Sequence, residues 1–327
     1  MTPITLDLLF DWKISRNTSN QKFNQLIEVS EHKFIGRSEL AFNIRYEESL
    51  ELVQDQFSNF VNRWPNEILE LSDFFQLIDS IELCSSLRCA IEWAYIDFIS
   101  QFTDQSVDEF LNIPLLRSVD TSFSIPIMEV SNIKRFVSEN NLNRFKSLKL
   151  KVNREQAYEL TEELASCFPG KIRIDGNEAW EDASEVLNFL NQISALNIEF
   201  LEQPIKAELY EQHLLLKNNT DIKIIADENI TSQTITKDLL RYFDGINIKL
   251  MKSAGPYNAI KQIKEAKSIG LEVLLGCMIE SSLGISMAFH LASLADYIDL
   301  DGFLLIKNDP FKILNESGGR IFSSSLQ

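Results

Sequence analysis

From residue 120 onward the sequence alternates between short apolar runs and amphipathic segments, and this pattern most strongly limits the possible folds. The intervening segments 155–168, 181–196, 232–243 and 256–270 repeat apolar residues at the i, i+3, i+4 spacing of a helix packed on one face. Strict alternation of strand and helix predicts parallel strands joined by right-handed crossovers. The eight strand-like runs are SFSIPI (122–127), SLKLKV (147–152), KIRIDGN (171–177), IEFLEQP (198–204), KIIADEN (223–229), GINIKLM (245–251), EVLLGCM (272–278) and DYIDLDG (296–302).

Eight such units fit a closed α/β barrel of the TIM type. The alternative is an open doubly wound sheet. No G-x-G-x-x-G or P-loop motif follows the first run, and polar residues recur late in many runs instead of at one switch point. The pattern therefore favours a barrel domain over residues 119–302.

Residues 1–118 have a different texture. Segments 4–10 and 23–29 alternate like strands, whereas 50–64 and 85–102 repeat apolar residues at helical spacing. This part is predicted to be an α+β domain. The tail, from about 303 to 327, leaves the alternating pattern and is expected to return to that domain.

Charged residues interrupt the apolar strands near their carboxyl ends. From Lys151 to Lys249 the successive intervals are 24, 27, 25 and 22 residues, about one βα unit each. The carboxyl ends of parallel barrel strands meet at one face, where barrel enzymes place their active sites. A single carboxylate at a strand end is usually a helix cap or a surface ion pair, but a regular series is not expected from such roles. The series is Lys149, Lys151, Asp175, Glu202, Asp227, Lys249, Asp299 and Asp301.

Three carboxylates from adjacent strands, without His or Cys, form an oxygen donor set that suits Mg²⁺, with Mn²⁺ as a substitute. Lys151 and Lys249 belong to strands on opposite sides of these carboxylates. One lysine could remove a proton from one face of a carbon while the other returns it on the opposite face. Crowding beside Lys149 and a metal is expected to disfavour protonation of Lys151, and Lys149 itself is assigned to electrostatic support.

Composition excludes several other classes. The chain has 31 Lys and Arg against 48 Asp and Glu, a net charge of −17, which argues against a nucleic-acid partner. No apolar stretch of about 18 residues is present to span a membrane. The four cysteines are too sparse for a disulfide framework, and the N-terminal residues lack the pattern of a signal peptide, so a cytoplasmic location is expected. The three histidines are well separated, which disfavours zinc sites and Ser-His-Asp catalysis.

In order and spacing, SLKLKV, RIDGNEAW, FLEQP, ADEN and INIKLMKSAG resemble the motifs of the enolase superfamily, muconate lactonising enzyme subgroup. This resemblance implies a (β/α)7β barrel with an N-terminal α+β capping domain. It makes Lys149 and Lys151 the K-x-K pair, with Lys151 as one acid/base and Lys249, rather than Lys252, as its partner. The ligands of one Mg²⁺ ion per site become Asp175, Glu202 and Asp227.

Within this subgroup the sequence is most similar to the dipeptide epimerases, through NIKLMK, GCMIESSLGISMAFHLA and the D-x-D pair of DYIDLDG. The resemblance implies an isomerase that epimerises the C-terminal residue of an L,L-dipeptide to L,D by 1,1-proton transfer. Asp299 and Asp301 would hold the free ammonium group of the dipeptide. The resemblance also suggests a homo-oligomer. Besides Lys149, the residues expected to line the dipeptide site are Ser124, Cys277, Met278 and Ile279.

Two alternatives remain open at this stage. An o-succinylbenzoate synthase shares the metal ligands and lysines but eliminates water from a substrate without an ammonium group. A non-catalytic barrel would keep the same residues by descent. The dipeptide side chains are not specified by the sequence, and it does not show which of the capping-loop arginines Arg16, Arg37 and Arg45 faces the pocket.

Overall fold

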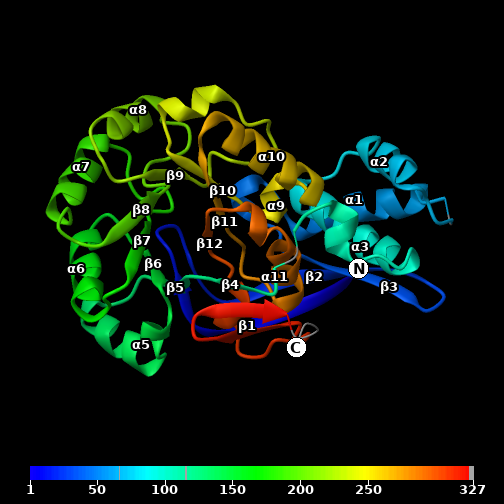
Figure 1. The fold of residues 1–327 in the computed structure, drawn as a ribbon, viewed down its shortest axis with the longest axis horizontal. Helices are drawn as coiled ribbons and strands as arrows, with labels where there is room; N and C mark the ends of the chain where they lie inside the picture. Colours follow the sequence, from blue (N-terminus) through cyan, green and yellow to red (C-terminus); the bar gives the residue numbers. More distant parts are fainter. Residues whose placement is uncertain (66, 115, 324–327) are drawn as a thin grey trace.

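The computed structural model describes residues 1–65, 67–114 and 116–323. A curled sheet of eight parallel strands forms its centre, with the strands side by side in chain order (Figure 1). Each predicted run contains one of these strands, so the predicted parallel α/β arrangement is confirmed. The strands are β5 (Phe123–Ile125), β6 (Ser147–Lys151), β7 (Lys171–Asp175), β8 (Ile198–Glu202), β9 (Ile224–Ala226), β10 (Gly245–Ile248), β11 (Glu272–Leu275) and β12 (Tyr297–Ile298).

The first and last strands of this sheet are linked. The Ser122 backbone N–H donates to the Ile298 carbonyl at 3.3 Å, and the Leu300 N–H donates to Thr121 Oγ1 at 2.9 Å. Helices cover the outer surface of the curled sheet (Figure 1). They are α5 (Ile133–Glu139), α6 (Ala157–Cys167), α7 (Ala183–Gln192), α8 (Tyr210–Asn218), α10 (Pro256–Ile269) and α11 (Ser282–His290). The short helix α9 (Leu250–Ser253) follows β10 and packs against α3 (Ser85–Phe102) of the N-terminal part.

One helix prediction is wrong. Segment 232–243 contains only a short 3-10 helix, η4 (Lys237–Arg241). Side chains satisfy backbone N–H groups before η4, since Gln233 Oε1 accepts locally from the Thr231 N–H and the distant Glu265 carboxylate accepts from the Ile235 N–H. Bonds from side chains to the backbone compete with helical hydrogen bonds, so the helical spacing of apolar residues alone is misleading here.

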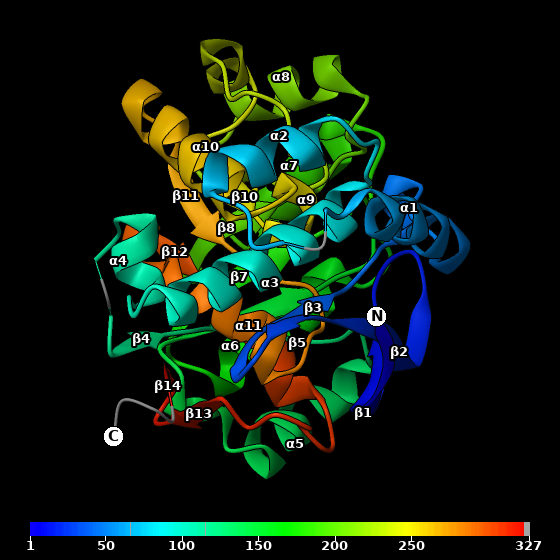
Figure 2. The same ribbon diagram turned by 90° about the vertical axis from the view of Figure 1, so that its right-hand side faces the viewer.

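The N-terminal part combines a three-stranded antiparallel sheet with helices, as predicted for an α+β unit. Figure 2 views this cap from its own side, where α3 lies against both β3 and α9. The predicted strands and helices at 4–10, 23–29, 50–64 and 85–102 are confirmed. The elements are β1 (Thr2–Lys13), β2 (Thr18–Glu31), β3 (Phe34–Leu40), η1 (Ile44–Tyr46), α1 (Leu50–Arg63), α2 (Leu71–Asp79), α3 (Ser85–Phe102) and α4 (Val107–Leu111).

The tail contacts both parts of the chain. Strands β13 (Leu314–Ser317) and β14 (Arg320–Ser323) pair with each other, and β14 pairs with β4 (Ser118–Asp120). Ile306 forms an antiparallel bridge with Leu8, and the Lys307 N–H donates to the Asp7 carbonyl at 2.8 Å. Positions 324–327 of the predicted tail lie outside the described residues. The division at residues 118 and 302 stays a prediction.

A buried carboxylate joins the cap to the start of α10. Glu92 of α3 accepts a hydrogen bond at 3.0 Å from the Tyr257 N–H in the first turn of α10, where unpaired N–H groups favour negative charge. Gly255 lies against this carboxylate with φ of 125°, and a Cβ there would come within 2.5 Å of Glu92 Oε2. Only glycine fits this close approach, which fixes the chain segment that follows Lys249.

Candidate active site

Strand register places the predicted charged residues side by side. Lys151 pairs with Asp175 across β6 and β7, and Asp175 pairs with Glu202 across β7 and β8. Glu202 pairs with Ile225 on β9, two residues before Asp227. Parallel strands with matched ends therefore bring the carboxylates of three neighbouring strands into one row, with Lys151 on one side and Lys249, after β10, on the other.

Lys149 is at the centre of the buried charges. Its Nζ lies 3.1 Å from Asp175 Oδ2, 2.8 Å from Glu202 Oε2 and 2.8 Å from Asp299 Oδ2. The Lys149 side chain is only 2% exposed. Burial disfavours its charge, but the surrounding carboxylates outweigh burial and raise its pKa well above the ordinary value. The electrostatic role of Lys149 in the reaction stays a prediction.

The two lysines expected to transfer protons each contact a different carboxylate. Lys151 Nζ lies 2.5 Å from Asp175 Oδ2, and Lys249 Nζ lies 2.7 Å from Asp227 Oδ2. Both lysines line the same cavity. Lys252 instead donates to the Asp227 backbone carbonyl and side chain from a position outside that cavity. The orientation therefore favours Lys249 over Lys252 as the group that can reach a bound substrate.

The acidic residues differ in their protonation tendencies. Burial opposes ionisation of Asp175, yet Lys151 and Lys149 overcome it and lower its pKa. Burial likewise opposes ionisation of Asp227, whose pKa is lowered by Lys249 and Lys252. For Glu202, burial and the neighbouring charge of Asp175 raise the pKa.

The contacts of Lys249 favour its charged form. Burial disfavours charge on Lys249, but the attraction of Asp227 prevails and raises the Lys249 pKa. The carboxylates that would hold a cation are the same groups that raise this pKa. Whether Lys249 can act as a base thus depends on how the negative charge of these carboxylates is divided between this lysine and a bound cation.

The donor chemistry of the three carboxylates fits a hard divalent cation. Asp175 and Glu202 are completely buried and Asp227 is 2% exposed. Glu202 Oε2 lies near Lys149 Nζ but accepts no hydrogen bond, while Asn247 Nδ2 donates to Oε1 at 2.7 Å. Within the described ranges no group of three or more His, Cys, Asp or Glu side chains is arranged so that it could hold a metal ion. Lys149, Lys151 and Lys249 engage the carboxylates instead.

A cavity of about 540 Å³ lies between the cap and the carboxyl ends of the strands. Asp175 and Glu202 lie beneath its lining, whereas all the other predicted site residues reach it. Trp12 of the cap also lines it, with its ring centroid 5.9 Å from Lys151 Nζ. The predicted residues in the lining are Ser124, Lys149, Lys151, Asp227, Lys249, Cys277, Met278, Ile279, Asp299 and Asp301.

The D-x-D carboxylates have unequal surroundings. Asp299 accepts from Ser122 Oγ at 2.7 Å and pairs with Lys149, and its pKa is lowered although burial opposes this. Asp301 Oδ2 accepts from the Ser124 backbone N–H at 2.6 Å. Burial and repulsion from Asp299 raise the Asp301 pKa to about 7. Asp301 therefore lacks a cationic partner comparable to the one that Asp299 has in Lys149.

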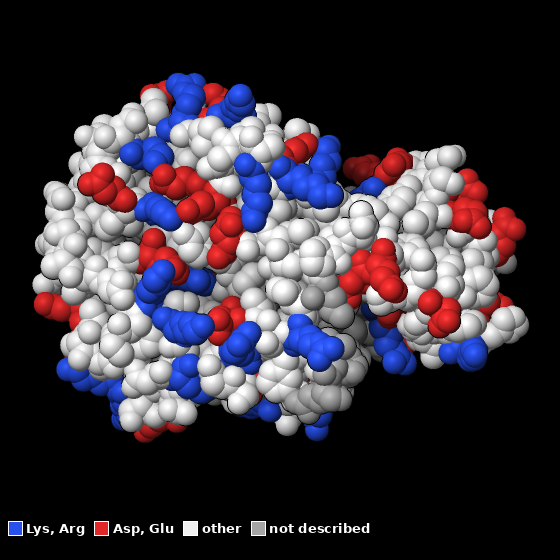
Figure 3. Space-filling view, in the orientation of Figure 1, with Lys and Arg blue, Asp and Glu red and all other residues white. Residues whose placement is uncertain are grey.

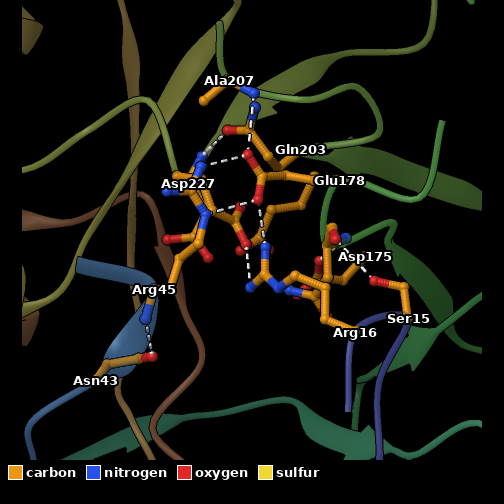
Figure 4. Close-up of polar contacts among 12 residues, drawn as sticks. Ser15, Arg16, Asn43, Arg45, Asp175, Glu178, Gln203, Ala207 and Asp227 are labelled. Atoms are coloured by element: carbon orange, nitrogen blue, oxygen red, sulfur yellow. Dashed lines mark hydrogen bonds and ion pairs between the residues drawn. The ribbon is translucent and has the colours of Figure 1, made fainter. Parts of the chain in front are cut away.

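Sequence reasoning did not identify the partners of the cap arginines. Arg16 and Arg45 line the cavity, and both reach Glu178, which follows β7 (Figure 4). Arg37 lies elsewhere, paired with the exposed Glu28 at 2.9 Å. No motif distinguishes these three arginines. Glu178 is 162 positions from Arg16 and 133 from Arg45, whereas Glu28 lies opposite Arg37 across strands β2 and β3. Over the barrel part of the face in Figure 3, basic and acidic side chains lie intermingled.

Comparison with known proteins agrees with this architecture. Residues 131–304 match the family model described as enolase C-terminal domain-like. The L-Ala-D/L-amino acid epimerase of Flavobacterium johnsoniae is 29% identical over 306 residues, which are 93% of this chain and 90% of the relative. Pedosphaera parvula has an L-Ala-D/L-amino acid epimerase that is 35% identical over 73% of this chain and 70% of the relative.

Among solved structures, a dipeptide epimerase from Enterococcus faecalis, complexed with Mg and the dipeptide L-Leu-L-Tyr, has a TM-score of 0.87. It is 22% identical, and the match covers 98% of this chain and 95% of the other. The chain belongs to the enolase superfamily, through the enolase C-terminal domain-like family. Within that superfamily it is a dipeptide epimerase-like protein, and it is an enzyme of the isomerase class that acts on amino acid derivatives. None of the described helices is both long and apolar enough to cross a bilayer.

Proposed function

We propose that this protein is a Mg²⁺-dependent dipeptide epimerase that moves a proton on and off the α-carbon of the C-terminal residue of a dipeptide, converting L,L to L,D and back. The position of Lys151 and Lys249 carries this proposal. These lysines flank the row of three carboxylates and line one cavity. A carbon held between them has one amine on each face, as inversion by two acid/base groups requires.

The other residues of the cavity would bind different parts of the dipeptide or hold the residues that do so. Asp301, with Asp299 beside it, offers negative charge to the free ammonium group of a dipeptide, and a buried ammonium needs such a partner. Lys149 keeps Asp299 and Glu202 in place through its ion pairs. Ser124, Cys277, Met278 and Ile279 line the same cavity and would contact the remainder of the dipeptide.

Asp175, Glu202 and Asp227 would hold the Mg²⁺ ion. When bound there, the ion supplies positive charge that stabilises the negative charge developing on the substrate carboxylate as the α-proton leaves. Relatives of known structure are complexed with Mg, which supports this assignment.

The direct test is hydrogen exchange from solvent. The protein is incubated with Mg²⁺ and a library of dipeptides in D₂O, and α-deuterium is measured by mass spectrometry and NMR. At least one dipeptide should gain a single α-deuterium together with inversion at its C-terminal residue. If no dipeptide gains deuterium, the proposed reaction is wrong.

An o-succinylbenzoate synthase would need no acidic partner for an ammonium group. Asp301 lines the cavity, is 3% exposed and has no ion pair with a lysine or arginine among the described residues. A buried carboxylate without a cationic partner fits an ammonium ligand better than a substrate that lacks one. This observation favours the dipeptide over the dehydration substrate.

The remaining predictions fit the same proposal. The two hydrogen bonds between the ends of the eight-stranded sheet support a closed (β/α)7β barrel over residues 119–302. The cap would comprise residues 1–118, completed by the tail from about residue 303. Cytoplasmic location and a homo-oligomeric state stay predictions from the sequence.

A further inference from the structure

Two separate segments of the cap converge on one carboxylate of the barrel. Arg16, in the loop between β1 and β2, contacts Glu178 at 2.5 Å. Arg45, in η1, binds the same carboxylate through two parallel hydrogen bonds of 2.8 and 2.7 Å. Figure 4 shows both guanidinium groups pointing at Glu178. The Glu178 side chain is 7% exposed, so solvent weakens these ion pairs much less than it would at the surface.

The same cap loop also grips the residue before Glu178. Ser15 Oγ donates to the Asn177 carbonyl at 2.7 Å. Asn177 and Glu178 have φ values of 44° and 64°, so two consecutive residues other than glycine occupy the left-handed region. Such a backbone persists only when its surroundings hold it. On the barrel side the Glu178 N–H donates to the Gln203 carbonyl at 2.8 Å and the Ala207 N–H donates to Glu178 Oε1 at 2.9 Å.

This turn ends at a residue of the active site. The Asn177 N–H donates to Asp175 Oδ1 at 2.9 Å. Asp175 Oδ2 meanwhile faces Lys151 and Lys149. The conformation of residues 176–178 therefore sets where one oxygen of the Asp175 carboxylate points. The backbone at Gly176 packs too closely for any side chain, because a Cβ there would come within 2.7 Å of Pro204 Cα.

We propose that Glu178 is a positioning residue that couples closure of the cap to the orientation of the Asp175 carboxylate. When Arg16 and Arg45 bind Glu178, the turn is held and the Asn177 N–H stays on Asp175. The coupling is reciprocal, so a cation bound by Asp175 also favours the closed cap. The inference rests on the proposed function, since it takes Asp175 as a ligand of the cation.

The second cap contact of Arg16 reinforces this arrangement. Arg16 also lies 2.8 Å from Glu228, which follows Asp227 in the sequence. Two arginines thus contact two barrel carboxylates, and each carboxylate follows a predicted metal ligand in the chain: Glu178 comes three residues after Asp175, and Glu228 comes directly after Asp227. Both arginines are partly exposed, at 32% and 34%, whereas both carboxylates are buried. The arginines can therefore leave with the cap while the carboxylates stay with the barrel.

The test uses Glu178→Gln, which removes the charge and keeps the shape, in the full-length protein. Hydrogen–deuterium exchange is measured over residues 14–17 and 43–47 without added metal, and the Mg²⁺ dissociation constant is measured by calorimetry. Glu28→Gln is the matched control, because it breaks an exposed Arg–Glu pair of the same cap sheet. We expect Glu178→Gln to raise exchange in both segments at least tenfold and to raise the Mg²⁺ dissociation constant at least threefold. Glu28→Gln should change neither.

A purely structural contact would lower the unfolding midpoint and loosen the cap without changing Mg²⁺ affinity. Faster exchange with a dissociation constant within twofold of the unaltered protein would therefore overturn the coupling, and so would unchanged exchange. Should Glu178→Gln fail to fold, Arg45→Gln gives the same readouts with the carboxylate still paired to Arg16. The unaltered protein tests the proposed function separately. If the protein exchanges the α-hydrogen of no dipeptide, the proposed reaction is refuted. The amide hydrogen–deuterium exchange and the calorimetry would still test the coupling.

Discussion

Lys149 Nζ lies 2.8 Å from Asp299 Oδ2, and this contact joins the second strand of the curled sheet to its last. Asp299 follows β12 directly, and Lys149 is in the middle of β6. Where the two ends of the sheet meet, β5 lies between β6 and β12. The buried ion pair therefore spans β5 and connects the two sides of the site. Charge at this end of the sheet thus contributes to the structure as well as to chemistry.

Lys149→Met should destabilise the fold. It leaves Asp175, Glu202 and Asp299 without their common cation, and breaking a buried ion pair from one side typically costs about 3–5 kcal/mol. We expect the free energy of unfolding, measured by urea titration in EDTA, to fall by about 3 kcal/mol. Lys223→Met, which breaks a half-exposed pair with Glu272, should cost less than about 1 kcal/mol. Equal effects of the two changes would contradict this view.

Replacing each of the two flanking lysines should abolish α-hydrogen exchange of a different epimer. Replacing either Lys151 or Lys249 with Gln should slow epimerisation at least about 100-fold, since each supplies one acid/base step. Each variant should still exchange the α-hydrogen of one epimer with D₂O, and the epimer that exchanges should differ between the variants. NMR of L,L- and L,D-dipeptides incubated separately measures this. Loss of both exchanges in one variant and neither in the other would show that a single base operates.

Asp301→Asn should impair substrates that carry a free ammonium group. Loss of a charged hydrogen bond costs about 1.5–3 kcal/mol, so kcat/KM for a free dipeptide should drop at least tenfold. The N-acetylated form of the same dipeptide serves as the control substrate, because it presents no ammonium, and its turnover should change little. A variant that keeps full activity on the free dipeptide would remove Asp301 from ammonium binding.

His213 should make the fold sensitive to acid. It is completely buried, and this burial lowers its pKa to about 4 from the ordinary 6.5. Between these pH values the unfolded chain binds a proton that the folded protein does not, so stability falls as the pH drops from about 6.5 to about 4. The full shift corresponds to about 3 kcal/mol. Urea midpoints across this range should depend less on pH in His213→Gln, whereas His32→Gln, at an exposed histidine, should retain the dependence.

The sequence predicts much of the barrel because its signals are local. Each strand is a short apolar run, and the carboxylates follow the strands at regular intervals, so register alone brings Asp175 beside Glu202. The face of β6 on which Lys149 and Lys151 lie can also be predicted from the sequence, since residues two apart on a strand share a face. The error at 232–243 arises where side chains such as Gln233 satisfy the backbone in place of a helix.

The cap contacts could not be predicted in this way. Glu178 meets Arg45 across 133 positions of the chain and Arg16 across 162. No periodic pattern connects such residues, and no motif separates Arg37, which pairs with Glu28, from Arg16 and Arg45, which share Glu178. The bond from Asn247 to Glu202 has the same character, because an amide within an apolar strand gives no signal of what it will face. Long-range polar pairing is fixed by the assembled fold, which the sequence pattern describes only in outline.

The pairing of Leu8 with Ile306 has a consequence for how the protein is made. A ribosome releases residue 8 long before residue 306, so the bridge between Leu8 and Ile306 can form only after nearly the whole chain has been synthesised. Closing so large a loop is entropically costly and is expected to come late in folding. A nascent chain halted before residue 306 would therefore expose this part of β1 to other strands and to proteases, and the cap would be completed only after synthesis is almost finished.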